Sequence, residues 1–226
     1  MKNKIAEIES FVQETMAKVT NPERRIGHDF KHVDRVRNWA LILAKHEQRP
    51  ELELIEAAAL LHDIGLAYVT ERQHHAEIGA DIATDFLEKQ DHFSKNKIKQ
   101  IYNAIRLHSS PKPGDWLADL LRDADRMELF GAVGIIRAFS SKHWKEEYDP
   151  LNIKGETWRF SIQQFEGRFA DGTGIGPTIV DQLNFQLSLY DDLYTESAKR
   201  LARPFYTFTQ QFILQLEQEI NAPIPN

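Results

Sequence analysis

The sequence predicts an all-α protein, and three observations support this fold class. Apolar residues recur at intervals of three and four from residue 2 to about residue 140, which is the period of an amphipathic helix. No segment sustains the alternation of apolar and polar residues that marks a strand. Proline and glycine stand between the apolar runs, where they separate one helix from the next. The chain has 226 residues, of which 42% are hydrophobic, so it is long and apolar enough to bury a sizeable core.

The helices of the first part of the chain are predicted from these runs and from the residues that interrupt them. The first run begins near residue 2 and ends at Asn21-Pro22. Arg49-Pro50 separates the next two runs, because proline cannot continue a helix without losing a hydrogen bond. The further ranges expected to be helical are Phe30 to Gln48, Glu51 to Asp63, 75–89, 95–108 and about 115–139.

The second part of the chain begins with a segment of a different kind. Residues 141–176 mix aromatic with polar residues and run into Asp171-Gly-Thr-Gly-Ile-Gly-Pro, which favours a long irregular loop. Helical periodicity returns at about 178–194 and again from Thr195 to Ile220, where Pro204 predicts a kink or a break. We therefore expect a single domain over residues 1–226, with a helical core at about 5–140, an irregular loop at about 141–176 and C-terminal helices at about 178–220.

The composition excludes several classes of function. The chain has no cysteine, so it has no disulfide bond, no thiolate metal site and no cysteine nucleophile. Its 28 basic and 34 acidic residues give a net charge of −6 and form no basic stripe, so no nucleic-acid polymer is expected as a partner. The most apolar stretch, Leu54 to Leu61, contains Glu56 and is far shorter than the roughly 20 residues of a membrane span. We expect a cytoplasmic protein that does not bind membranes.

Histidines and carboxylates gather near the ends of the predicted helices. His62 and Asp63 close an apolar run, and neighbouring positions on a helix are about 100° apart, so both could reach one ion only in a cleft between helices. His28 and His32 are four residues apart, and Arg35 lies one turn beyond His32. All three could therefore share one helix face, which would place a metal ligand beside a phosphate-binding group.

Asp123 and Asp125 form a second acidic motif. Two residues apart on a helix, they point in different directions, so only one of them can bind the same ion directly. Neutral imidazoles together with carboxylates suit Mn, Fe, Ni, Co or Zn, whereas Mg ordinarily prefers more oxygen ligands. The residues alone therefore predict a divalent metal site and leave the choice between Asp123 and Asp125 open.

The order of these residues resembles the HD superfamily of metal-dependent phosphohydrolases. The likeness rests on His32 ahead of Arg35-Val36, on His62-Asp63 within Leu-Leu-His-Asp-Ile-Gly, and on Asp125 within Ala-Asp-Arg-Met. The surrounding motifs are similar to a bacterial subgroup of nucleoside triphosphate pyrophosphohydrolases. The resemblance implies an HD-domain helical bundle with a helical C-terminal extension, in which His32, His62, Asp63 and Asp125 bind the metal.

Two further histidines bear on the number of metal ions. His75 and His108 stand where the members of this superfamily that hold two metals have additional ligands. In such a site Asp63 would bridge the two ions. Because the most similar subgroup resembles proteins with one metal, we expect one ion rather than two.

The resemblance also implies a reaction. A divalent cation lowers the pKa of its bound water, so that hydroxide can attack phosphorus in a small phosphorylated substrate, by resemblance a nucleotide. The subgroup implies release of pyrophosphate from a (deoxy)nucleoside triphosphate. We expect Asp63, Arg35 and Arg126 to be the catalytic residues, the two arginines as phosphate binders. The residues that could hold a second metal or a substrate phosphate are His75, His108, His28, Lys31, Lys112 and Arg122.

Two other functions stay open. In some relatives the same helical scaffold carries two irons and activates oxygen, so an oxygen-dependent product and two irons per chain would indicate an oxygenase. A metal-bearing domain can also act as a sensory or interaction module, which would show full metal occupancy without turnover. A homodimer is open as an alternative to a monomer.

Overall fold

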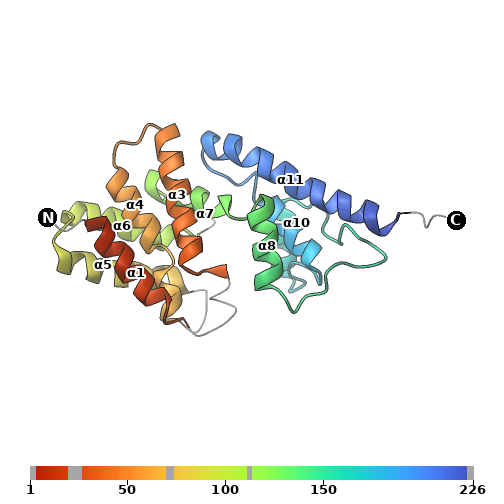
Figure 1. Cartoon of the computed structure of the whole chain (residues 1–226), viewed down its shortest axis with the longest axis horizontal. Helices are drawn as coiled ribbons and strands as arrows, with labels where there is room; N and C mark the ends of the chain where they lie inside the picture. Colours follow the sequence, from red (N-terminus) through yellow and green to blue (C-terminus); the bar gives the residue numbers. More distant parts are fainter. Residues whose placement is uncertain (1–3, 20–26, 70–73, 111–113, 223–226) are drawn as a thin grey trace. The chain divides into compact units, whose positions relative to one another are not determined.

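The computed structural model describes residues 4–19, 27–69, 74–110 and 114–222 and confirms the all-α fold class (Figure 1). These described residues contain helices and two isolated β-bridges, but no β-strand. The helices are α1 (Lys4–Met16), α3 (Phe30–His46), α4 (Leu52–Leu61), the 3-10 helix η1 (Ile64–Ala67), α5 (His75–Gln90), α6 (Lys95–Leu107), α7 (Trp116–Met127), α8 (Gly131–Ser141), α9 (Ile162–Ala170), α10 (Ile179–Ser188) and α11 (Glu196–Ile220).

Apart from the one expected over about 115–139, the predicted helices of the first part are present, and most lie within a few residues of their expected bounds. Two of them begin at side-chain caps, which satisfy backbone N–H groups that have no partner inside the helix. Asp29 accepts a hydrogen bond from the backbone N–H of His32 at the start of α3. Ser94 accepts one from the backbone N–H of Lys97 at the start of α6. The first helix was predicted to run to Asn21-Pro22, but it already ends at Met16, and Asn21-Pro22 itself lies outside the described residues.

The prediction of one helix over about 115–139 is wrong, because the chain leaves the helix after Met127 and enters α8 at Gly131. Gly131 has φ +70, a left-handed conformation that favours glycine, and a Cβ atom there would lie 3.1 Å from Cβ of Phe205. The break thus depends on a contact with a residue more than seventy positions away. The apolar period continues across it, which is why periodicity alone suggested one helix.

The prediction of an irregular loop over about 141–176 is wrong for α9, which occupies Ile162–Ala170. Its start carries a capping box: the Ser161 hydroxyl accepts from the backbone N–H of Gln164, whose side chain accepts from the backbone N–H of Ser161. The Ser-x-x-Gln spacing of this motif was visible in the sequence. The described residues on either side of α9 are irregular.

The chain divides into two compact units. The first consists of Met1–Met127 with Tyr194–Ala198, and the second of Glu128–Leu193 with Lys199–Asn226. In the first unit α4 is the central helix: it contacts α1, α3, α6 and α7, and most of its side chains are buried. The single domain expected over residues 1–226 stays a prediction, since compact units of this kind occur both within and between domains.

The second unit has its own core, formed where α8, α10 and α11 meet around residues such as Ile135, Leu183 and Ile213. Its irregular segments are tied to α10 by Asp181, which is 1% exposed. The Asp181 carboxylate accepts hydrogen bonds from the backbone N–H and the hydroxyl of both Thr157 and Thr178. One buried carboxylate therefore fixes two segments that lack regular structure.

The last helix, α11, continues through Pro204 from Glu196 to Ile220, so the break predicted as one alternative at this proline is absent. Across the part of the chain that the structure describes, no helix combines the length and the apolar character that crossing a bilayer requires.

Candidate metal centre

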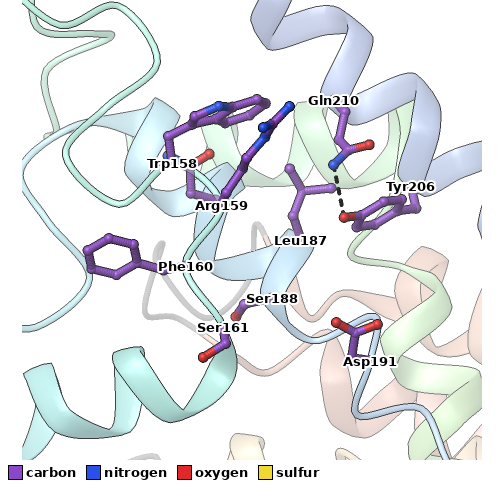
Figure 2. Close-up of a pocket in the computed structure, with 10 residues that line it drawn as sticks. Trp158, Arg159, Phe160, Ser161, Leu187, Ser188, Asp191, Tyr206 and Gln210 are labelled. Carbon is purple, nitrogen blue, oxygen red and sulfur yellow. Dashed lines mark hydrogen bonds between the residues drawn. The ribbon is translucent and has the colours of Figure 1, made fainter.

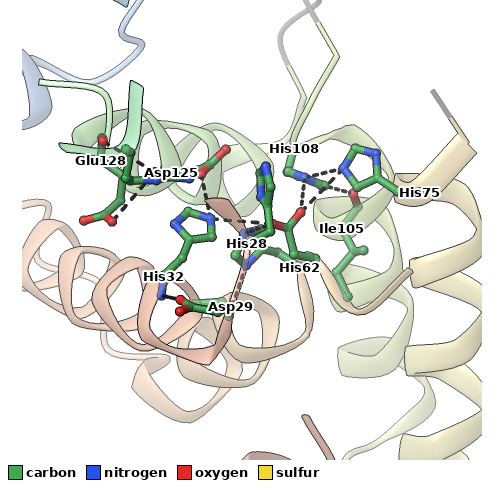
Figure 3. A network of polar contacts seen from close by, with 12 residues as sticks. His28, Asp29, His32, His62, His75, Ile105, His108, Asp125 and Glu128 are labelled. Carbon is green, nitrogen blue, oxygen red and sulfur yellow. Dashed lines mark hydrogen bonds and ion pairs between the residues drawn. The ribbon is translucent and has the colours of Figure 1, made fainter. Parts of the chain in front are cut away.

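The four residues predicted to bind a metal meet in one cluster within the first unit (Figure 3). His32 Nε2 lies 3.3 Å from Asp125 Oδ1 and 3.5 Å from Asp63 Oδ2. His62 Nε2 lies 3.4 Å from Asp63 Oδ2. His32, His62 and Asp63 are each at most 2% exposed, whereas about a third of the Asp125 side chain, 32%, is accessible. The cluster is therefore buried and meets solvent beside Asp125.

The end of α4 delivers two of these side chains. The helix ends at Leu61, His62 keeps helical backbone angles, and Asp63 leaves them with φ −101 and ψ 6 to begin η1. This change of backbone direction lets two adjacent side chains approach the same point, which a continuous helix would prevent. Because α4 is packed on several sides by other helices, the pair is held at the centre of the first unit.

Gly65 brings a further helix close to the His-Asp pair. A Cβ atom on Gly65 would lie 2.0 Å from the carbonyl oxygen of His75 and 2.9 Å from Cα of Gly79. Such an approach excludes any side chain at position 65 and sets η1 directly against the first turns of α5. The glycine of the His-Asp-Ile-Gly sequence therefore places His75 within reach of Asp63.

Three more histidines complete the cluster. His75 Nε2 and His108 Nε2 each lie 3.6 Å from Asp63 Oδ1, and they lie 3.2 Å from each other. His28 Nδ1 lies 2.7 Å from the other oxygen, Asp63 Oδ2. The two oxygens of one carboxylate thus face two groups of imidazoles, so Asp63 is the centre of the whole arrangement.

The imidazole tautomers suit metal binding. His62 Nδ1 lies 2.8 Å from the carbonyl oxygen of Ala59, and His108 Nδ1 lies 2.6 Å from that of Ile105. A carbonyl oxygen only accepts, so Nδ1 carries a hydrogen in both rings, and in the neutral form of each ring Nε2 presents a lone pair. His62 Nε2 is buried and makes no hydrogen bond. Metal-binding histidines are held in this manner, and the residues present therefore fit a cation.

The electrostatics of the cluster also favour a cation. Burial opposes ionisation of Asp63, but the charges of His62 and His28 and hydrogen bonds from His108 and His28 hold the pKa of its carboxyl well below the usual range. Burial likewise opposes ionisation of Asp125, but its hydrogen bond with His32 and the charges of His32 and His62 lower its pKa. Both groups are thus carboxylates near neutral pH, which gives the cluster two negative charges.

Of the two candidate aspartates on α7, the structure places Asp125 in the cluster and turns Asp123 away from it. Asp123 is fully buried and accepts hydrogen bonds from the backbone N–H groups of Tyr194 and Thr195 and from the Thr195 hydroxyl, at 2.7–2.8 Å. Burial raises the pKa of Asp123 despite these bonds. Asp123 therefore anchors the start of α11 to α7 within the first unit.

The predicted phosphate binders fall into different environments. Arg35 is half-buried on α3, one turn beyond His32, and Arg126 follows Asp125 directly. Arg122 is buried and donates to Asp119 Oδ1 and to the carbonyl oxygen of Leu107, which indicates a structural role. Lys31 is exposed, with Nζ 3.3 Å from Asp29 Oδ2. Lys112 lies outside the described residues.

Tyr194 is a residue that the sequence did not single out. Its ring centroid lies 4.4 Å from the Arg122 guanidinium and 5.8 Å from that of Arg126, and its backbone N–H is bound by Asp123. A tyrosine about seventy residues from α7 carries no sequence signal for this position. It forms an aromatic surface beside the arginine that follows Asp125.

Comparisons with known proteins agree with this arrangement. A family model described as HD domain matches residues 29–150, which is more than half of the chain. The uncharacterized protein YpgQ of Bacillus subtilis (strain 168) is 26% identical over 200 residues, covering 86% of this chain and 85% of YpgQ. Among solved structures, an HD-superfamily hydrolase from Bacillus thuringiensis is 27% identical, with 97% of this chain and 98% of that chain covered and a TM-score of 0.67.

The fold of a second solved structure matches as well. YpgQ of Bacillus subtilis in complex with ADP has a TM-score of 0.64 at 24% identity, with 96% of this chain and 95% of that chain covered. HD domains bind divalent metals, and the described residues contain His/Asp groups whose ligand atoms lie close enough to hold one. The match to the family model over most of the first unit, together with the helical fold, shows that this chain belongs to the HD domain family.

Proposed function

We propose that the protein is a metal-dependent phosphohydrolase that acts on a small phosphorylated substrate of the nucleotide class. The observation that carries this proposal is that the side chains of four residues come together in a largely buried cluster: His32, His62, Asp63 and Asp125. Imidazole lone pairs and carboxylates that face one another in a buried space are the donor set of a divalent transition metal. Similarity to the HD-superfamily hydrolase of Bacillus thuringiensis supports the hydrolytic class of reaction.

We further infer that the cluster would hold two ions, whereas the resemblance to the subgroup implied one. Both oxygens of Asp63 face imidazoles, and the His75 and His108 nitrogens lie on the side opposite to the first group. In this proposal Asp63 would serve both ions. His32, His62 and Asp125 would help to hold the first ion, and His75 and His108 would help to hold the second.

The chain's own residues prepare this site for hydrolysis. When bound, a divalent cation makes water a nucleophile near neutral pH and polarises a phosphoryl oxygen. The carbonyl groups of Ala59 and Ile105 keep His62 and His108 in the tautomer that presents Nε2 to the site. His28 Nδ1 lies within hydrogen-bonding distance of Asp63 Oδ2, at 2.7 Å, so His28 helps to fix the orientation of that carboxylate.

Arg35 and Arg126 supply positive charge for a substrate phosphate. Both flank ligand residues, Arg35 one turn after His32 and Arg126 directly after Asp125, where the cluster is accessible. A guanidinium binds phosphate oxygens through charge-assisted hydrogen bonds. We propose that these two arginines neutralise and orient the phosphate chain.

A nucleotide is the proposed substrate, with pyrophosphate as the product released from a (deoxy)nucleoside triphosphate. Support comes from YpgQ, a relative at 26% identity whose structure has been solved with ADP. The His-Asp arrangement and its neighbouring arginines suit a chain of phosphates, because each anionic group gains a cationic partner.

The proposal is tested by assaying the purified protein with Mn²⁺ against nucleoside mono-, di- and triphosphates, while both phosphate and pyrophosphate are measured. We expect turnover of triphosphates with pyrophosphate as product. Two bound irons with an oxygen-dependent product would instead establish the oxygenase alternative. Full metal occupancy with no turnover across the panel would establish a sensory or interaction module.

The Arg35→Ala variant is expected to raise KM for the triphosphate about tenfold while the metal content stays unchanged. The reason is that one charge-assisted hydrogen bond contributes roughly 1.5 to 3 kcal/mol, and 1.4 kcal/mol corresponds to tenfold in affinity. Steady-state kinetics and elemental analysis measure the two quantities. Lys45→Ala, an exposed position on the same helix, is the matched control. Loss of metal in Arg35→Ala would contradict the assigned role.

A further inference from the structure

The second unit contains a cavity of about 380 Å³ that has no part in the metal centre. Its walls come from three segments: residues 158–161 ahead of α9, residues 184–191 at and after the end of α10, and residues 206–210 of α11. The volume falls within the roughly 300 to 1,000 Å³ of pockets that bind small molecules. All lining residues belong to the second unit, so the cavity is defined by that unit alone.

Three aromatic side chains contribute to walls that are otherwise mostly polar. Trp158, Phe160 and Tyr206 line the cavity, with Leu187 between them (Figure 2). Gln210 Nε2 donates a hydrogen bond of 2.9 Å to the Tyr206 hydroxyl, and the Tyr190 ring packs on Tyr206 with centroids 4.5 Å apart. Tyr206 is thus held from two directions. Aromatic faces fixed in this way suit a planar ring, which can stack on them.

Arg159 brings a positive charge to the same cavity. Its backbone has φ +62, in the left-handed region that residues with a side chain seldom occupy, and such conformations cluster at ligand sites. Its guanidinium lies 5.7 Å from the Trp158 ring centroid, beside the indole in Figure 2. Within the described part of the chain, it forms no ion pair with a carboxylate. The cation is therefore available to an anionic ligand.

Two other polar groups refine the chemistry of the cavity. Burial and the nearby Asp191 carboxylate raise the pKa of Tyr206, so its hydroxyl remains protonated and can donate a hydrogen bond while it accepts one from Gln210. Asp191 lines the cavity away from Arg159 (Figure 2). A carboxylate at that place accepts hydrogen bonds from ring N–H or amino groups.

We propose that this cavity binds a planar nitrogen heterocycle that carries an anionic group. The ring would stack on an aromatic side chain of the wall, its anionic group would reach Arg159, and its N–H groups would face Asp191. The anionic group could be a phosphate, as in a nucleotide, or a carboxylate. This site does not depend on the proposed phosphohydrolase activity, because none of its residues belongs to the metal centre.

The test uses the full-length protein and isothermal titration calorimetry with two anionic probes, AMP and indole-3-acetate, each paired with a neutral counterpart, adenosine and indole. We expect one anionic probe to bind at least tenfold more tightly than its neutral counterpart, and the better probe identifies phosphate or carboxylate as the anionic group. The Asp63→Asn variant is titrated in parallel. Binding that persists in this variant does not need the proposed ions, and the arginine variants described next assign it to the cavity.

Variants at Arg159 assign the binding to the cavity. Arg159→Gln is expected to lower the affinity for the anionic probe at least tenfold and the affinity for the neutral probe less than twofold. Arg159→Lys should retain part of the affinity that Arg159→Gln loses. Arg203→Gln, an exposed arginine on α11 outside the cavity, is the matched control and should bind as the parent does. The proposal is overturned if neither anionic probe binds in the Asp63→Asn background, or if Arg159→Gln and Arg203→Gln have equal effects.

Discussion

The Asp63→Asn variant is expected to lose both bound ions and to lower hydrolysis by at least about 1,000-fold. Asparagine keeps the shape of the side chain but removes the negative charge that the histidines on both sides of Asp63 face. The variant therefore lacks the carboxylate that is proposed to help hold both ions. Elemental analysis of the purified variant measures the metal per chain, and the nucleotide assay measures turnover. Circular dichroism checks that the helices remain.

Two comparison variants make this result specific. His108→Ala should retain one ion, because His32, His62 and Asp125 stay in place on the side of Asp63 Oδ2. Asp81→Asn, an exposed aspartate on α5, should keep parental metal content and activity. Metal content in Asp63→Asn equal to that of the parent would remove the proposed centre. A parent that never exceeds one ion per chain would restrict the site to a single metal.

Asp181→Ala is expected to destabilise the second unit by about 3 kcal/mol or more. The carboxylate accepts four hydrogen bonds from Thr157 and Thr178 and is 1% exposed, so its removal leaves buried donors without an acceptor. Each buried polar group left unsatisfied costs roughly 1 to 3 kcal/mol. Urea unfolding followed by tryptophan fluorescence and circular dichroism gives the free energy of unfolding.

The size of this effect is judged against two further variants. Asp181→Asn should lose less stability, because the amide oxygen still accepts hydrogen bonds on one side. Asp171→Ala removes an exposed carboxylate that accepts a hydrogen bond from Thr173 in the adjacent loop, and its effect should stay within about 0.5 kcal/mol. If the Asp181→Ala and Asp171→Ala variants had the same free energy of unfolding, the buried Asp181 carboxylate would have no structural role.

Much of the fold could be predicted because helix formation leaves local marks on a sequence. The period of apolar residues gave the helices of the first part, and the cap at Ser94 was visible without coordinates. The break between α7 and α8 was not predictable in the same way. It depends on the left-handed conformation of Gly131 and on the proximity of Phe205, which the sequence places far away. The cap of α9 at Ser161 is a local Ser-x-x-Gln motif and can be identified in the sequence.

The candidate metal ligands show a similar division. The family resemblance selected His32, His62, Asp63 and Asp125, and the structure brings these four together. The position of Asp123 could not be settled from its spacing, because it is decided by hydrogen bonds to Tyr194 and Thr195 about seventy residues away. Local spacing limits where a side chain can point, but it does not specify which distant segment arrives there.

By itself the sequence determined the all-α class, most helices of the first part and the types of residue able to hold a metal, because periodicity and donor chemistry are properties of short segments. Only the tertiary structure decided that both oxygens of Asp63 face imidazoles, that Asp123 turns to the start of α11, and that Arg159 and three aromatic rings line one cavity. These features depend on packing between segments that are distant in the chain, and that packing is set by the burial of the whole core rather than by any local pattern.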